Sequence, residues 1–157
     1  MLPRPFPLIR IMPNTPASVG EGMILYCRSP EVTDTDLQDF LRAMTHAGQF
    51  MDIEERLMTA GMAVSGCGPA FVDLFIESLA DAAVVCGISR KDAIRLSAQM
   101  VLGSARLVLE SGQHPGELKD AVCSPGGTTI RAVAELEKHG FRSAVIEAVR
   151  VCADAAN

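Results

Sequence analysis

The sequence predicts a mainly α-helical protein that begins with a small α/β unit. Segments with the character of strands all lie before residue 54, whereas later segments repeat their apolar residues at intervals of three and four, the period of a helix. The chain has 157 residues, of which 48% are hydrophobic and 21% charged, so it can form a folded core. We therefore expect two domains, residues 1–53 and 54–157.

The first 53 residues are expected to follow the order strand, strand, helix, strand. The segment Pro13–Pro16 excludes a helix there, because proline restricts the residue before it to extended geometry. A short apolar run then lies between a glycine and a Ser-Pro break, as a buried strand does. The expected elements are an extended strand from about residue 8, a strand over Gly22–Cys27, a helix capped by Thr33 or Asp34 and ended by Gly48, and a strand over Gln49–Ile53.

The remainder is expected to be helical. Two consecutive helices are apolar nearly all round, so most of their surface must be covered, and about 100 residues offer too few covering layers. We therefore expect a homodimer with interleaved helices, and the alternative is a compact monomeric bundle. The expected helices are Glu55–Val64, Pro69 to about Cys86, a helix capped by Ser89 that ends near Glu110, Gly116–Val122, a helix from Ser124 or Gly126 to Gly140, and Arg142–Ala155; the second should be mostly buried.

Composition excludes several classes of function. The formal net charge is −5, and the basic residues are scattered beside a single tyrosine, which argues against nucleic-acid binding. The first ten residues resemble neither a signal peptide nor a transit helix, and charges interrupt the apolar stretches, so we expect no membrane span and a cytoplasmic protein. No CxxC pair predicts a metal site, and the cysteines should be reduced and mostly buried: Cys27, Cys67, Cys86, Cys123 and Cys152.

The segment Cys123–Ile130 is the most informative one in the chain. If Ser124 or Gly126 begins a helix, the amides of four consecutive residues lack acceptors within that helix, and its dipole favours a carboxylate or phosphate. Those residues are Gly126, Gly127, Thr128 and Thr129, and the two threonines add hydroxyl groups. The alternative is a tight turn with a serine cap, although a cap requires neither two glycines nor two threonines.

The loop Ser65–Ala70 is a second candidate site. It fails the dinucleotide fingerprint, because Phe71 replaces the third glycine and Pro69 removes an amide. We expect a kink between helices, where glycines permit the close approach of a backbone or a flat ring. Neither cysteine of the two candidate loops has a neighbouring base in the sequence, and the three histidines are expected to be surface or capping residues.

Four segments, in their order and spacing, resemble pyrroline-5-carboxylate reductase from about Ile9 to the end of the chain: Met12–Pro16, Ser65–Ala70, His114–Asp120 and Ser124–Ile130. The resemblance implies reduction of 1-pyrroline-5-carboxylate to proline, the last step of proline synthesis, with NADPH or NADH. It also implies that residues 1–53 are a remnant of a Rossmann domain without the main cofactor loop. Residues 54–157 would be an all-helical dimerisation and substrate-binding domain, like the C-terminal domain of 6-phosphogluconate dehydrogenase, in a homodimer that can assemble into rings.

The same resemblance implies roles for individual residues. Ser124, Gly126, Gly127 and Thr128 match the turn that holds the substrate carboxylate, and Thr129 matches a threonine proposed to hydrogen-bond the imine nitrogen and help it receive its proton. The residues implied to lie near the cofactor are Asn14, Thr15, Pro16, Ser65, Gly66 and Gly68.

The sequence departs from the family in two respects. Met62–Val64 and Cys67 replace residues that the family commonly shows before and within the kink, which puts polar contacts to the nicotinamide in doubt. The glycine-rich cofactor loop is missing, so we expect a truncated gene, an isolated domain or a fragment, without measurable activity alone. The alternative function is a stand-alone helical dimerisation or interaction module.

Overall fold

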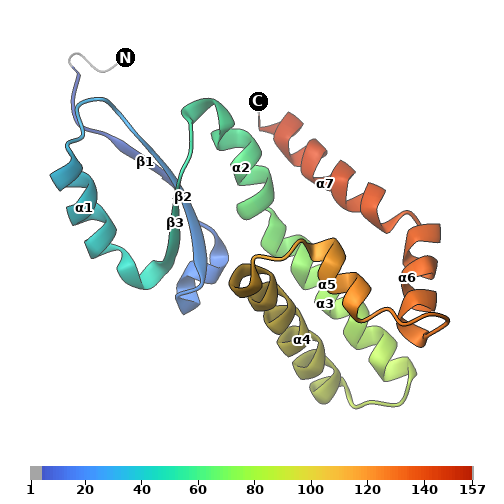
Figure 1. Ribbon diagram of the computed structural model, residues 1–157. Helices are drawn as coiled ribbons and strands as arrows, with labels where there is room; N and C mark the ends of the chain where they lie inside the picture. Colours follow the sequence, from blue (N-terminus) through green and yellow to red (C-terminus); the bar gives the residue numbers. More distant parts are fainter. Residues whose placement is uncertain (1–4, 157) are drawn as a thin grey trace. The chain divides into compact units, whose positions relative to one another are not determined.

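A computed structural model of the chain describes residues 5–156 and contains a small sheet followed by helices (Figure 1). It divides into two compact units. Unit 1 comprises the residues up to Ala70 together with those from Glu147 onward, and unit 2 comprises Phe71–Ile146. The expected mainly helical fold after a small α/β unit is confirmed, whereas the domain boundary after residue 53 stays a prediction.

Unit 1 contains a three-stranded sheet in the order β1-β2-β3. The first two strands are antiparallel and pair Ile9 with Arg28, whereas β2 and β3 are parallel and pair Gly22 with Gly48. The elements of this unit are β1 (Ile9–Met12), η1 (Thr15–Val19), β2 (Gly22–Arg28), α1 (Asp34–Ala43), η2 (Thr45–Ala47), β3 (Gly48–Asp52), η3 (Glu55–Leu57), α2 (Met58–Ser65) and the end of α7 (Phe141–Ala155).

Helices pack on both faces of β2. On one face, Tyr26 forms a buried cluster with Val32 and Leu37, and Leu37 belongs to α1. On the other face, Leu25 is only 3% exposed, and α2 approaches it so closely that a methyl group on Gly61 would contact the Leu25 side chain. Burial on both faces explains why the sequence of β2 is a continuous apolar run.

The predicted start of α1 is confirmed, but its predicted end is wrong. Thr33 and Asp36 form a reciprocal capping box, in which each side chain accepts from the backbone amide of the other residue. The helix ends at Ala43, the 3-10 turn η2 follows, and Gly48 is the first residue of β3 rather than a helix stop. Gly48 has φ of 134° and lies against the backbone of Gly22, so the close approach of two strands accounts for it.

Unit 2 is entirely helical within the described residues. Ser89 caps α4 as predicted, by accepting a hydrogen bond from the amide of Asp92 at 3.2 Å. His114 caps α5 by accepting from the amide of Gly116 at 3.0 Å, which confirms a capping histidine. The elements are α3 (Gly68–Val85, from Phe71 on), α4 (Arg90–Ser111), α5 (Pro115–Ala121), α6 (Thr128–Lys138) and the start of α7.

The prediction that α3 is mostly buried is wrong for a single chain. Only Ala80 of this helix is buried, while Leu74 is 65% and Val85 88% exposed. By length and composition, the run Glu55–Val85 could even cross a membrane, with 6% of its apolar window buried within the chain. Core helices of proteins that do not enter a membrane have the same length and composition, so the expectation of no membrane span stays a prediction. Apolar surface of this extent requires a covering partner or environment.

The cysteines also differ from their prediction. All five are free thiols, yet Cys86 is exposed and the other four are half-buried, so none is the fully buried side chain that was expected. Within a single chain the helices leave too much surface open to enclose them.

Candidate functional site

The start of α6 is built by a β-turn over Ser124–Gly127. The carbonyl of Ser124 accepts from the amide of Gly127 at 3.0 Å, Pro125 occupies the second position, and Gly126 has φ of 68° at the third. This combination is typical of a type II turn. The helix therefore begins at Thr128 with Gly127 as its N-cap, two residues later than the latest predicted start, because the left-handed backbone of Gly126 cannot continue a helix.

The turn leaves backbone N–H groups at the start of α6 as hydrogen-bond donors for a ligand. The amide of Gly127 has no acceptor within the helix, as expected, but it donates to the Ser124 carbonyl and so closes the turn. For Gly126, Thr128 and Thr129, the described part of the chain contains no hydrogen-bond acceptor for the amide, and no side chain caps the helix. Both threonines are exposed. The arrangement can therefore receive an anion through backbone donors at the positive end of the helix dipole.

The Asn14 side chain joins the two other predicted segments. Its Nδ2 donates to the carbonyl of Ser65 at 3.0 Å, and its Oδ1 accepts from the amide of Met23 at 3.1 Å. Asn14 thereby connects the residues before η1 to the start of β2 and to the end of α2. Both polar atoms of the amide are occupied, so this side chain positions the backbone of the segments that the sequence analysis assigned to the cofactor.

The loop between α2 and α3 forms the predicted kink. The carbonyl of Met62 accepts from the amides of Gly66 and Cys67, at 2.8 and 3.1 Å, and α3 restarts at Gly68. A side chain on Gly68 would contact nothing within 4 Å, so one face of the loop is open. Thr15 is exposed and Pro16 half-buried at the start of η1.

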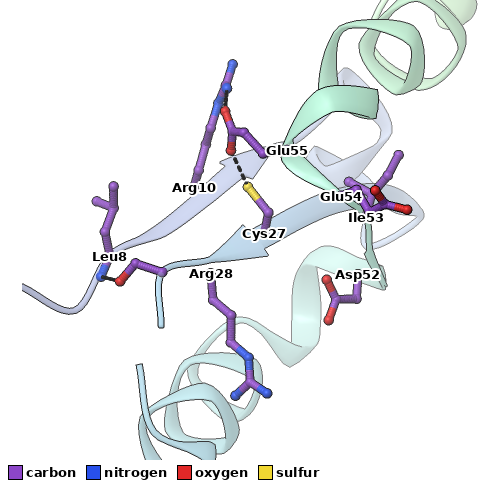
Figure 2. A pocket seen from close by; sticks show the side chains of 9 residues that line it. Leu8, Arg10, Cys27, Arg28, Asp52, Ile53, Glu54 and Glu55 are labelled. Carbon is purple, nitrogen blue, oxygen red and sulfur yellow. Dashed lines mark hydrogen bonds and ion pairs between the residues drawn. The ribbon is translucent and has the colours of Figure 1, made fainter. Parts of the chain in front are cut away.

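A polar cluster at the end of the sheet is not predicted by the sequence. A cavity of about 440 Å³ lies there, and Figure 2 shows the Cys27 thiol pointing at Glu55 beside Arg10. Cys27 donates to Glu55 Oε2 at 2.7 Å, and Arg10 forms an ion pair with the other oxygen of the same carboxylate. Arg28, on another wall, pairs with Asp34 at 2.8 Å. No local pattern signals this cluster, because its members are far apart in the sequence.

The electrostatics of this cluster make Cys27 a poor nucleophile. Burial, followed by the hydrogen bond and charge of Glu55, raises the pKa of Cys27 to about 11. The hydrogen bond from Cys27, together with Arg10, lowers the pKa of Glu55. At neutral pH the thiol is therefore protonated and the carboxylate ionised, so the cluster links β1 and β2 to η3 and lacks the thiolate that covalent chemistry needs.

The predicted site residues thus form two groups. Asn14 and Ser65 are joined directly within unit 1, whereas the turn over Ser124–Gly127 and the start of α6 belong to unit 2. Among the described residues, no group of three histidine, cysteine or acidic side chains is arranged to hold a metal ion.

A family model described as pyrroline-5-carboxylate reductase dimerisation matches residues 55–157. Pyrroline-5-carboxylate reductase from Escherichia coli is 51% identical over 145 residues, which cover 92% of this chain and 54% of that protein. The protein of the same name from Synechocystis is 50% identical over 143 residues, which cover 91% and 54%.

Solved structures give the same result. Plasmodium falciparum pyrroline carboxylate reductase with NADP bound is similar with a TM-score of 0.88 and 40% identity, over 95% of this chain and 60% of that one. A reductase from Coxiella burnetii has a TM-score of 0.89 and 34% identity, over 96% and 56%. The chain spans about half the length of the curated relatives that it matches.

Proposed function

The chain belongs to the pyrroline-5-carboxylate reductase family, and on that premise we propose that it forms the substrate-binding and dimerisation part of an enzyme that reduces 1-pyrroline-5-carboxylate to proline with NADPH or NADH. The reaction would complete proline synthesis. The observation that carries the proposal is the start of α6, where amides without a protein acceptor and two exposed hydroxyl groups share one helix end.

The turn and the first residues of α6 fit the carboxylate of this substrate. We assign the anchor to Ser124, Gly126, Gly127 and Thr128. Ser124 and Gly127 close the turn, and the amides of Gly126 and Thr128 have no acceptor among the described residues. The dipole contributes about 0.3–1 kcal/mol to a bound carboxylate. Each charge-assisted hydrogen bond contributes about 1.5–3 kcal/mol.

Thr129 is the proposed catalytic residue. Its exposed hydroxyl group lies one residue beyond the anchor and can donate a hydrogen bond to the imine nitrogen of a ring whose carboxylate occupies the turn. Holding that nitrogen beside a donor would favour its protonation as the ring carbon is reduced. The reaction needs no covalent nucleophile, in agreement with the protonated state of Cys27 at neutral pH.

We propose that the predicted cofactor residues contact only the nicotinamide end of the cofactor. The open face at Gly68 leaves room for a flat ring, and Asn14 holds this loop against the segment of Thr15 and Pro16 through Ser65. Packing alone requires a glycine at position 66, because an added side chain would lie 2.9 Å from the Met62 carbonyl oxygen. A bound nicotinamide would supply the hydride, while these residues position it.

Self-association follows from the exposed apolar side chains of the helices. Leu74 and Leu109, on α3 and α4, are 65% and 82% exposed, more than a soluble helical protein leaves open over such a length. We propose a homodimer that covers these faces, with further assembly into rings, and a cytoplasmic location in keeping with five free thiols.

Ligand binding to the purified chain tests the α6 site. NMR titrations would compare L-proline with cyclopentanecarboxylate, which keeps the ring and carboxylate but lacks the ring nitrogen. Thr129→Ala should weaken proline binding about 2- to 10-fold, the range of one hydrogen bond, and leave cyclopentanecarboxylate unchanged. Gly126→Ala, which strains the turn, should weaken both ligands.

Gly140→Ala is the matched control. Gly140 follows the other end of α6 with φ of 72°, and, as at Gly126, an added side chain there would meet nothing within 4 Å. The two substitutions therefore impose similar backbone strain, and only the first affects the donors at the helix start. Equal effects of both variants on binding, or unchanged affinity in Thr129→Ala, would show that the turn is only structural.

A further inference from the structure

We propose that unit 2 contains a binding site for an apolar molecule with one carboxylate group, in a cavity between α5, α6 and the start of α7. The cavity has a volume of about 330 Å³, at the lower end of the range for small-molecule sites. All of its lining residues belong to unit 2, and none belongs to the turn over Ser124–Gly127. The cavity therefore shares no residue with the carboxylate anchor of the proposed function.

Apolar side chains from two helices line the cavity. Val133 and Leu136 lie three positions apart on α6, so they share one face of that helix, and Phe141 is the first residue of α7. The ring of Phe141 contacts the ring of Phe75 on α3, with centroids 5.9 Å apart, and this contact holds Phe141 in place. A small ring or a short hydrocarbon chain can bury its surface against these side chains.

Two cationic side chains line the same cavity. Arg142 donates from Nε to Glu137 Oε1 at 2.5 Å, and its two terminal nitrogens have no partner among the described residues. Lys119 forms an ion pair with Asp120 and has two further N–H groups to donate. The terminal N–H groups of an arginine match the two oxygens of a carboxylate, so Arg142 is the residue that we assign to the charged end of the ligand.

The polar side chains of the cavity favour a carboxylate over an amine. Nδ1 of His114 accepts from the Gly116 amide at 3.0 Å, so the proton of the neutral ring is on Nε2, which can donate to a ligand. Arg142 and Lys119 are donors as well, whereas Glu137 is the one carboxylate in the lining, and Arg142 already binds it. Donors therefore outnumber acceptors among these side chains.

Titration of the purified chain with 3-phenylpropionate tests the site. This probe combines a carboxylate with an apolar ring, and the methyl NMR signals of Val133 and Leu136 report binding in the cavity. We expect these signals to shift and to saturate. The amide 3-phenylpropanamide has nearly the same shape without the charge, so it should bind at least about 10-fold more weakly.

Substitutions locate the charged and apolar ends of the probe. Arg142→Gln should weaken 3-phenylpropionate about 10- to 100-fold and the amide less than about 3-fold. Arg150→Gln is the matched control: Arg150 lies on the same helix, is similarly exposed and also pairs with a carboxylate, but does not line the cavity. Val133→Phe places a ring in the cavity and should abolish the binding of both probes, while circular dichroism should show unchanged helix content.

The outcome can be separated from that of the reductase site. Gly126→Ala strains the turn before α6, yet it should leave the affinity for 3-phenylpropionate, measured at Val133 and Leu136, unchanged. The absence of methyl shifts would overturn the proposal, and this includes the case in which a second copy covers the cavity. Equal affinity for the two probes, equal effects of Arg142→Gln and Arg150→Gln, or lost affinity in Gly126→Ala would overturn it as well.

Discussion

Asn14→Ala removes the amide that joins the segment before η1 to both β2 and α2. Two hydrogen bonds are lost, from Nδ2 to the Ser65 carbonyl at 3.0 Å and from the Met23 amide to Oδ1 at 3.1 Å, and both are partly buried. At about 0.5–1.5 kcal/mol each, the free energy of unfolding should fall by about 1–3 kcal/mol. For a chain of this size Tm should then fall by about 2–12 °C. Urea unfolding followed by circular dichroism measures the change.

Two controls make this experiment specific. Ser18→Ala, in the same 3-10 turn, removes an exposed hydroxyl that donates to the Thr15 carbonyl at 2.9 Å, and it should change the free energy by less than about 0.5 kcal/mol. Asn14→Asp keeps the acceptor for the Met23 amide but loses the donor to Ser65, so its free energy of unfolding should lie between those of Asn14→Ala and Ser18→Ala. If Asn14→Ala costs no more than Ser18→Ala, the reasoning that this amide holds the two segments together is refuted.

Three further predictions address packing, titration and assembly. Gly61→Ala places a methyl group against the Leu25 side chain and should cost about 1–3 kcal/mol in the same urea assay; a neutral result would contradict close packing of α2 on the sheet. The rate of Cys27 alkylation should have its midpoint near pH 11, and Glu55→Gln should lower that midpoint. Because the pKa of Cys27 is raised, its protonated thiol stabilises the fold. This stability is present below the ordinary pKa of 9.0 and is lost as the pH rises through about 11. Sedimentation at micromolar concentration should give about twice 16.7 kDa, and the single-chain mass would exclude the dimer.

Local signals in the sequence predicted the starts of several helices. The caps at Thr33 and Ser89 depend on residues three positions apart, so they can be recognised without tertiary structure. The same logic failed at α6. There the Ser-Pro-Gly-Gly sequence has enough turn-forming residues to build a hydrogen-bonded turn before the helix, which uses the Gly127 amide and delays the helix to Thr128.

Contacts between distant residues could not be predicted in this way. The Asn14 amide meets Ser65, and Cys27 meets Glu55, across separations for which the sequence has no periodic signal. The resemblance named Asn14 and Ser65 separately as cofactor residues, and only the fold shows that one holds the other.

The apolar sequence of α3 led to a wrong expectation of burial. Ala80 is its only buried residue within the chain, although the helix is apolar nearly all round. Apolar composition reports the surroundings of a helix in the assembled protein, so it indicates that cover is needed without saying whether the same chain or a second copy provides it.

The contact between Gly22 and Gly48 has a consequence for how this sequence can change in length. These residues pair at the first position of the parallel strands, and a side chain on Gly22 would lie 2.6 Å from the Ala47 carbonyl. An added residue within β2 would turn every following side chain to the opposite face and expose Tyr26. Insertions and deletions should therefore be rejected within β2 and β3.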